Sequence, residues 1–367
     1  MGGDINISGG TINATNGRIE LGSLNSDSVN FQKAEKGFTF DFDDVADVNL
    51  KNIVLDNLSA LNVSGNRNGF IKIRSSALNI LGESTISSNS SGEIALESTN
   101  SIVLDDQSKI VSEASNSSEK GASIFIETKK LSISNAAQIA SITDGKSNAG
   151  NIVIKGISIN LQDAIITPEG VESSSILTRT IEGSSGNAGN ININTEELKA
   201  SGGAKITSDS FSSGNAGNIS ISATKFIEFS GSLSLPSNVN ISEVASSNSP
   251  ALISSVAVNK GNSGRIKLST NNLSFTNGAS IFSANFGSGI SALVEINSNK
   301  INFSGTASDG KVPSGIFVST GGLMDGGSVF VNTQQISIKT TNLRRDSRQG
   351  KSFWAWMISS IFSVEVI

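Results

Sequence analysis

Short runs of alternating apolar and polar residues, each restarted by a small residue, recur along most of this chain. The clearest phrase is AGNIVI at 149–154, which returns as AGNINI at 188–193 and as AGNISI at 216–221. Such alternation is typical of a β-strand and predicts that Ile152 and Ile154 point inward while Val153 points outward. A unit this short cannot bury its own apolar face, so it must stack on copies of itself.

Each repeat contains three such runs. The first follows the glycine, the second is a run such as LSI at 131–133, and the third follows a small residue, as in AKITS at 204–208. Glycines at 92, 121 and 150 are 29 residues apart, and those at 189 and 217 are 28 apart, which sets the length of one coil. We therefore predict an all-β fold, a right-handed parallel β-helix with three sheets and about ten coils.

The same pattern sets the expected boundaries. We predict one β-helix domain over residues 1–341, with loop inserts at 167–183 and 236–260, where the steps between glycines lengthen. Residues 31–48 form an irregular insert, in which the aromatic run FTFDF at 38–42 predicts an outlying hairpin or a loop packed on the rod. Residues 342–367 lose the Ser/Asn/Gly character and hold both tryptophans, so we expect an atypical tail, either frameshifted or disordered.

Two residue types are expected to shape and connect the coils. Glycine permits the positive φ that a sharp turn between sheets requires. Asn190 and Asn218 each stand next to such a glycine. We expect their side-chain amides to bond to the asparagines in the coils above and below, as in a ladder.

Composition excludes several classes of function. The chain has no Tyr, Cys or His, so it has neither disulfides nor thiolate metal sites. A net charge of −5 is mild and argues against a nucleic-acid partner. The most apolar run, residues 353–367, is too short to cross a bilayer, so no transmembrane segment is expected. The opening MGGDINI reads as a repeat strand and not as a signal peptide, so we expect a fragment that begins inside the array.

Adjacent carboxylates are the first place to look for catalysis, because enzymes that cleave polysaccharides need clustered acids with a base or a metal. The three adjacent pairs are Asp43-Asp44, Asp105-Asp106 and Glu196-Glu197. We expect Asp105-Asp106 to lie in a solvated turn, and Asp43-Asp44 to lie in the irregular segment as a solvated pair or as a calcium or glycan site. Because His and Tyr are missing, we expect no catalytic residue, no cofactor and no metal site.

The remaining motifs carry little chemistry. GKS at 350–352 matches the end of a phosphate loop, but Arg345 stands where that loop needs its first glycine. With Arg344 and Arg348, Arg345 forms a basic cluster that we expect on the solvated surface. Outward strand positions carry Ser, Asn, Thr and Lys, which either keep the rod soluble or hold glycans weakly at many points.

Several phrases carry a family resemblance across roughly residues 2–345: GGDINI at 2–7, GRIELG at 17–22, GFTF at 37–40, and GNAGNI at 186–191 and 214–219. With these phrases the chain resembles the filamentous haemagglutinin-like exoproteins of two-partner secretion, in the form common in filamentous cyanobacteria. NLRRDS at 342–347 resembles the opening of another repeat.

The resemblance implies a β-helical adhesin that is secreted or held at the cell surface, associated with the outer membrane, and exported through a dedicated outer-membrane pore. Surface glycans or other cells are its expected partners, and the family offers no catalytic residues to carry over. The family's signal peptide and secretion domain are missing here, which agrees with a fragment. Two alternatives stay open: a polysaccharide lyase or depolymerase on the same fold, and a non-functional gene remnant.

Overall fold

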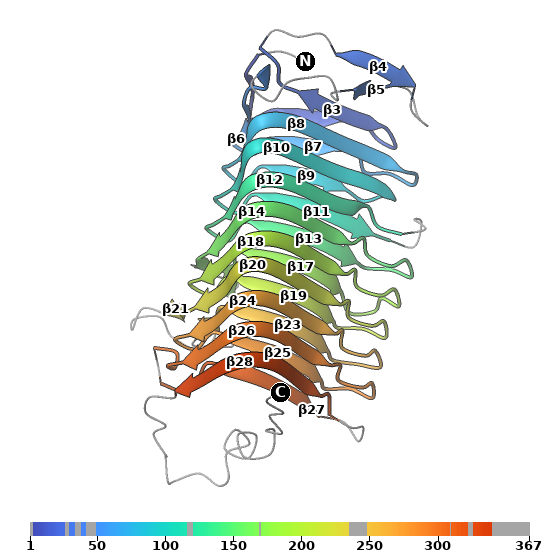
Figure 1. Ribbon diagram of the computed structural model, residues 1–367. Helices are drawn as coiled ribbons and strands as arrows, with labels where there is room; N and C mark the ends of the chain where they lie inside the picture. Colours follow the sequence, from blue (N-terminus) through green and yellow to red (C-terminus); the bar gives the residue numbers. More distant parts are fainter. Residues whose placement is uncertain are drawn as a thin grey trace.

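The described part of the chain is an all-β rod of stacked coils (Figure 1). The computed structural model describes residues 3–25, 29–33, 38–41, 49–115, 120–168, 170–234, 248–308, 310–321 and 326–339. Most strands belong to two parallel sheets, one 12-stranded and one 10-stranded, and sequential coils supply neighbouring strands of each sheet; among the described residues, three antiparallel pairs lie outside them. The predicted parallel β-helix is confirmed, and ten strands in the smaller sheet agree with the predicted number of coils.

The larger sheet contains β1 (Ile5–Ser8), β3 (Arg18–Gly22), β6 (Ile53–Asp56), β8 (Gly69–Ile80), β10 (Gly92–Leu104), β12 (Ser123–Ile133), β14 (Ile152–Gln162), β18 (Ile191–Ser201), β20 (Ile219–Ser230), β24 (Ile266–Thr276), β26 (Val294–Ser304) and β28 (Val329–Lys339). The smaller sheet contains β2 (Thr11–Asn13), β7 (Ala60–Asn62), β9 (Thr85–Ser88), β11 (Lys109–Ala114), β13 (Gln138–Thr143), β17 (Ser175–Thr180), β19 (Lys205–Ser210), β23 (Leu252–Ala257), β25 (Ser280–Asn285) and β27 (Gly315–Thr320).

The structure differs from the expected three sheets because, from β8 onward, the first two runs of each coil form one long, bent strand, whereas nearer the N-terminus β3 and β6 pair separately with the two halves of β8. In β14, Ile152, Ile154, Ile159 and Leu161 all face the core from one strand. A small or hydroxyl residue stands at the bend. In β18 this residue is Thr195, whose Oγ1 donates to the carbonyl oxygens of Ile157 at 3.0 Å and Glu197 at 3.1 Å. The hydroxyl bonds to backbone groups at the bend and so supports the change of direction within one sheet.

The core consists of identical positions stacked from coil to coil. Ile152 pairs with Ile191 in the next coil and Ile191 pairs with Ile219, and all three are fully buried. Val153 faces outward and is half-buried, as predicted. Toward the last coils the stack becomes aromatic, with Phe229, Phe275 and Phe303 at ring-centroid distances of 5.0 and 5.7 Å. Such stacks bury apolar area without a conventional globular core.

A second inward ladder is polar, which the sequence reading did not anticipate. In the smaller sheet the position two residues after the buried isoleucine is a buried hydroxyl residue in several successive coils: Ser112, Ser141, Thr178, Ser208, Ser255 and Ser283. The Oγ of Ser208 accepts from the N–H of Gly217 at 2.7 Å, and Ser255 does the same for Gly264 at 2.7 Å. The hydroxyls of Ser208 and Ser255 satisfy backbone donors of the strand-opening glycines that would otherwise be buried and unpaired.

Most of the strand-opening glycines are needed for close packing and have no positive φ; the predicted positive φ occurs at Gly92 (φ 127°) and at glycines of the turn after the long strand, such as Gly202 (φ 62°). A Cβ on Gly189 would lie 1.8 Å from the carbonyl oxygen of Gly150, and one on Gly217 would lie 1.8 Å from that of Gly189. At the same turn in other coils the left-handed residues are not glycine, as at Asp106 (φ 54°) and Gln107 (φ 58°).

The predicted asparagine ladder exists, but most of its acceptors bond to backbone. Asn190 Oδ1 accepts from the backbone N–H of Asn218 at 2.8 Å, and Asn151 Oδ1 accepts from that of Asn190 at 3.0 Å. A parallel ladder of the same kind joins Asn148, Asn187, Asn215 and Asn262. Asn187 and Asn148 also share a side-chain contact, with Nδ2 to Oδ1 at 3.1 Å. Each asparagine side-chain oxygen therefore accepts a backbone N–H of the next coil, which extends the parallel hydrogen-bonding pattern beyond the end of the strand.

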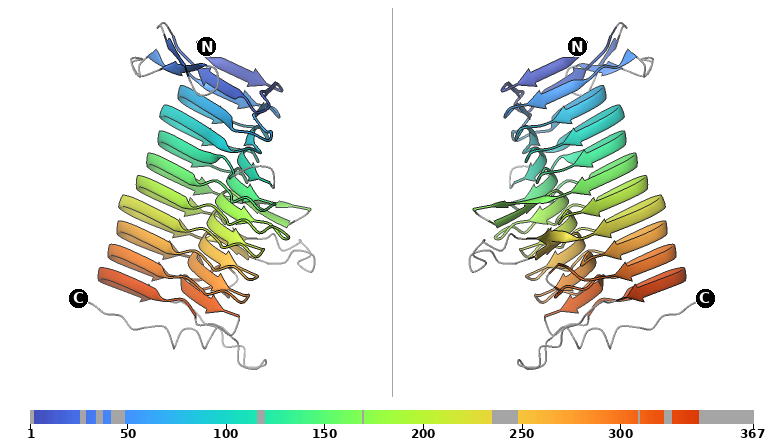
Figure 2. Two further views of the ribbon diagram at one scale, coloured as in Figure 1. Left: turned by 90° about the vertical axis from the view of Figure 1, so that its right-hand side faces the viewer. Right: turned by 90° about the vertical axis from the view of Figure 1, so that its left-hand side faces the viewer.

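The expected loop inserts at 167–183 and 236–260 are corrected, because each range contains a regular strand of the smaller sheet. The first insert is the antiparallel hairpin β15 (Ala164–Thr167) and β16 (Gly170–Ser173), which projects sideways in green in Figure 2, and β17 follows it directly. The second is bounded by the antiparallel pair β21 (Ser232–Ser234) and β22 (Asn248–Pro250), and β23 follows. Alternation continues through β17 and β23, but their serines and threonines hid the strand signal.

The irregular insert at 31–48 contains an outlying hairpin, one of the two forms expected. β4 (Asn30–Lys33) pairs antiparallel with β5 (Phe38–Asp41) at the N-terminal end of the rod (Figure 1). Residues 34–37 and 42–48 and the expected tail at 342–367 lie outside the described residues. In the part of the chain that the structure describes, no helix is both long and apolar enough to span a bilayer.

Candidate binding groove and outward ladders

The predicted acid pair Asp105-Asp106 lies in the turn between β10 and β11, as expected. Asp105 Oδ1 accepts from Ser134 Oγ at 2.9 Å, from Asn135 Nδ2 at 2.8 Å and from the backbone N–H of Asp106 at 2.9 Å. Ser134 and Asn135 belong to the next coil. The carboxylate of Asp105 therefore connects the turn of one coil to that of the next, which is a structural role.

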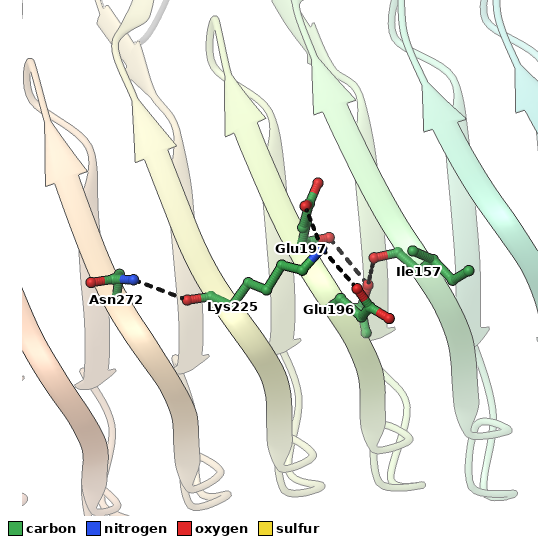
Figure 3. A network of polar contacts seen from close by, with 6 residues as sticks. Ile157, Glu196, Glu197, Lys225 and Asn272 are labelled. Carbon is green, nitrogen blue, oxygen red and sulfur yellow. Dashed lines mark hydrogen bonds and ion pairs between the residues drawn. The ribbon is translucent and has the colours of Figure 1, made fainter.

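The pair Glu196-Glu197 lies at the outward bend of β18, where one lysine of the next coil bridges both carboxylates (Figure 3). Lys225 Nζ lies 2.9 Å from Glu196 Oε2 and 3.1 Å from Glu197 Oε1. Hydrogen bonds from the ammonium to Glu196 and Glu197 raise the pKa of Lys225. Asn272 Nδ2 donates to the carbonyl oxygen of Lys225 at 3.3 Å, so the network runs on into a further coil.

Similar pairs of opposite charge recur on the outward face of the larger sheet. The side chains pair between neighbouring coils: Arg74 with Glu97 at 2.7 Å, Lys155 with Glu127 at 3.6 Å, Lys199 with Glu228 at 3.6 Å, and Lys267 with Glu295 at 3.2 Å. Exposed pairs add little to stability. Their effect is to make this face a regular array of balanced charges and hydrogen-bonding groups.

The other sequence candidates cannot be placed. Asp43-Asp44, GKS at 350–352 and the arginines at 344, 345 and 348 lie outside the described residues. Within the residues that are described, no group of three or more acidic, His or Cys side chains is placed to hold a metal ion.

A buried charged cluster on the smaller sheet was missed by the sequence reading. Arg179 on β17 lies beside Asp209 on β19, and Lys205 is on the same strand as Asp209. Asp209 is 8% exposed. Burial raises its pKa to about 6, against the lowering influence of Arg179, and burial lowers the pKa of Lys205. Only the register between β17 and β19 brings these charges together, and that register could not be read without the corrected inserts.

Among the described residues, a groove opens at the N-terminal end, between β3 and the β4–β5 hairpin. Its volume is about 450 Å³, and it is lined by Asn16, Gly17, Arg18, Glu20, Phe31, Phe38 and Phe40. Strand alternation places Ile19 and Leu21 of β3 toward the core, so Arg18 and Glu20 face outward and form the groove floor. The aromatic run singled out in the sequence supplies the wall.

Polar contacts fix the side chains that form the floor of the groove. Arg18 Nη1 lies 2.6 Å from Glu20 Oε1, and Glu20 Oε2 accepts from the backbone N–H of Phe40 at 2.7 Å. The Arg18 guanidinium lies over the Phe70 ring, 4.6 Å from its centroid. Glu20 therefore joins the hairpin to the rod while its own charge is balanced by Arg18.

The wall of the groove combines one anchored ring with two exposed rings. Phe40 packs against Leu24 and Leu50, and the centroids of Phe31 and Phe40 are 4.9 Å apart. Phe31 and Phe38 are 66% and 67% exposed, the highest values of any large apolar side chain in the described residues. This arrangement presents apolar ring faces beside a charge-balanced polar floor, which is the composition of a small-molecule site.

Comparison of this chain with protein-family models, with curated proteins and with solved structures returns no match.

Proposed function

We propose that this chain is a non-catalytic structural rod of the haemagglutinin-like type, which acts as an adhesin when it is displayed outside the cell. The observation that carries the proposal is the regular outward surface. Opposite charges pair from coil to coil, as in Lys155 with Glu127, and the exposed asparagines form continuous ladders. A stiff rod with a repeated polar face suits weak contacts at many points, which together give useful avidity.

The resemblance supports the location that we propose. The full protein would be secreted or held at the cell surface, associated with the outer membrane, after export through a two-partner pore. Protease treatment of intact producing cells tests this: a displayed rod is cleaved while cytoplasmic marker proteins survive. Complete protection of the rod in intact cells would contradict the proposed location.

Adhesion is tested with beads that carry the purified chain at high or low density, mixed with red blood cells. Multivalency predicts agglutination by dense beads and little binding by the soluble chain, with a gain of about 10²–10⁴ in apparent affinity. Beads coated with heat-unfolded chain are the control. Equal behaviour of folded and unfolded coats would sink the adhesin proposal.

The rival function is a polysaccharide lyase or depolymerase, and the buried Asp209 is the one observation that favours it. A carboxyl whose pKa is about 6 is able to exchange a proton near neutral pH. Incubation with acidic polysaccharides, assayed for new reducing or unsaturated ends, separates the two functions. Product formation that disappears in Asp209→Asn would make the chain an enzyme. The third alternative, a gene remnant, predicts that the purified chain unfolds without cooperativity.

A further inference from the structure

We propose that the groove between β3 and the β4–β5 hairpin binds the ring of a neutral hexopyranose sugar. The inference rests on the proposed adhesin function and assigns it one specific contact site in addition to the repeated faces. Three observations carry it: two exposed phenyl rings on one face of the hairpin, a polar floor without net charge, and a volume suited to a small ligand.

The exposed rings come from one face of the hairpin. Phe31 pairs directly with Phe40, and Phe38 pairs with Lys33, so alternation puts these four side chains on the same face. Phe40 is held by Leu24 and Leu50. Phe31 and Phe38 stay two-thirds exposed, although burying them would be favourable. A pyranose ring offers an apolar C–H face that covers a phenyl ring while its hydroxyls stay at the edge.

The polar floor favours an uncharged partner. Arg18 and Glu20 neutralise one another, and their side chains are only 19% and 6% exposed. The guanidinium has five N–H donors; its Nε is buried, so the donors that face the groove belong to the partly exposed Nη groups, of which Nη1 also contacts Glu20. Glu20 adds acceptor oxygens beside it. Hydroxyl groups, which both donate and accept, match such a mixed floor better than a phosphate or a carboxylate, which would meet Glu20.

The size and position of the groove agree with this assignment. About 450 Å³ lies at the small end of the range for ligand pockets, which accommodates one or two sugar rings. The hairpin stands at the N-terminal end of the stack of coils (Figure 1).

Saturation-transfer NMR on the purified chain tests the proposal with methyl β-glucopyranoside, methyl β-galactopyranoside and methyl α-mannopyranoside, with glucuronate as the charged comparison. We expect at least one neutral hexoside to bind, with the strongest transfer to the C–H protons of one ring face. The double variant Phe31→Ala/Phe38→Ala should weaken binding at least tenfold. Phe286→Ala, which removes a ring that is 51% exposed elsewhere on the rod, should leave it unchanged.

Three results would overturn the proposal. These are no binding of any neutral hexoside, tighter binding of glucuronate than of every neutral hexoside, and unchanged binding in the double variant. Sedimentation of the wild type and the double variant tests whether a second copy of the chain occupies the groove instead. If the wild type is a dimer and the double variant is a monomer, the groove is an interface between copies. Because both rings are exposed, the double variant should keep the wild-type melting temperature.

Failure of this inference is distinguishable from failure of the adhesin proposal. If dense beads agglutinate cells but no hexoside binds, adhesion stands and the groove assignment falls. If a hexoside binds and the double variant removes it while the beads stay inert, the sugar site stands and the adhesin proposal falls.

Discussion

The hydroxyl oxygen of Ser208 accepts a hydrogen bond from the backbone N–H of Gly217 at 2.7 Å, deep inside the rod. The glycine stacks so closely on the coil above that no side chain fits there. The two residues depend on each other. The glycine allows the coils to approach closely, and the serine hydroxyl accepts the hydrogen bond of the glycine N–H that this approach buries. The same pair recurs as Ser255 and Gly264.

Ser208→Ala should lower the free energy of unfolding by about 1–3 kcal/mol, because the Gly217 N–H is left buried without an acceptor. Urea unfolding followed by circular dichroism measures the change. Ser141→Ala is the matched control, since Ser141 occupies the same ladder position but its Oγ has no hydrogen-bond partner in the described residues. We expect that variant to be at least as stable as wild type, because it removes a buried hydroxyl that is unpaired. Equal losses in both would show that the Ser208 hydrogen bond contributes nothing specific.

Gly217→Ala should destabilise the rod by about 3 kcal/mol, the upper part of the range for overpacking, because the new Cβ would lie 1.8 Å from the Gly189 carbonyl oxygen. The loss appears as a lower urea midpoint. Gly315→Ala is the control, because a Cβ there meets its nearest neighbour at an ordinary 3.5 Å. A Gly217→Ala variant as stable as wild type would mean that the coils separate at little cost.

The period of two identified the strands and the direction of stacking, because one apolar face per short run leaves no other way to bury it. It could not show that two runs share one strand. The inward positions change phase between Ile193 and Leu198, which looks like the end of one strand and the start of another. The hydroxyl of Thr195, which supports the bend, looks like that of any outward threonine. Nor could it show which serines face the core. Ser208 is polar and looks like a surface residue in the sequence, and only the structure shows that the Gly217 N–H is its buried partner.

The sequence anticipated the hairpin beside the groove but not the groove itself. The aromatic alternation at 38–42 predicted an outlying hairpin or a packed loop, and the structure has the hairpin over residues 30–33 and 38–41. Its partner strand holds Phe31, but Arg18 and Glu20 lie in a repeat phrase that carries no sign of a site. The groove depends on how the hairpin folds back over β3, and that contact is made through the Glu20 carboxylate and a backbone N–H, which no side-chain pattern encodes.

Phe275→Ala should cost about 3–5 kcal/mol, because the ring is fully buried between Phe229 and Phe303 and its removal leaves a cavity in a stack that cannot easily collapse. Thermal unfolding measures the effect. Phe330→Ala, which removes a ring that is 62% exposed, should change the melting temperature little. If the two variants have the same melting temperature, the aromatic stack does not stabilise the later coils.

The stability of the rod should fall as pH rises from the ordinary pKa of an aspartate to that of Asp209. Burial raises the pKa of Asp209 from 3.8 to about 6. Across that window the folded chain holds more protons at this carboxyl than the unfolded chain, so the free energy of unfolding decreases with pH. At 1.36 kcal/mol for each pKa unit, this contribution is at most about 3 kcal/mol.

Asp209→Asn removes the titrating group and should flatten the dependence of the urea midpoint on pH across the same window. Lys205 provides an internal check of sign. Burial lowers its pKa, so its contribution to the free energy of unfolding increases with pH, at pH values above the Asp209 window. A series of urea titrations on wild type and Asp209→Asn, continued to alkaline pH, separates the two groups. If both proteins lose stability equally between pH values near 3.8 and 6, the carboxyl of Asp209 is not the group that responds.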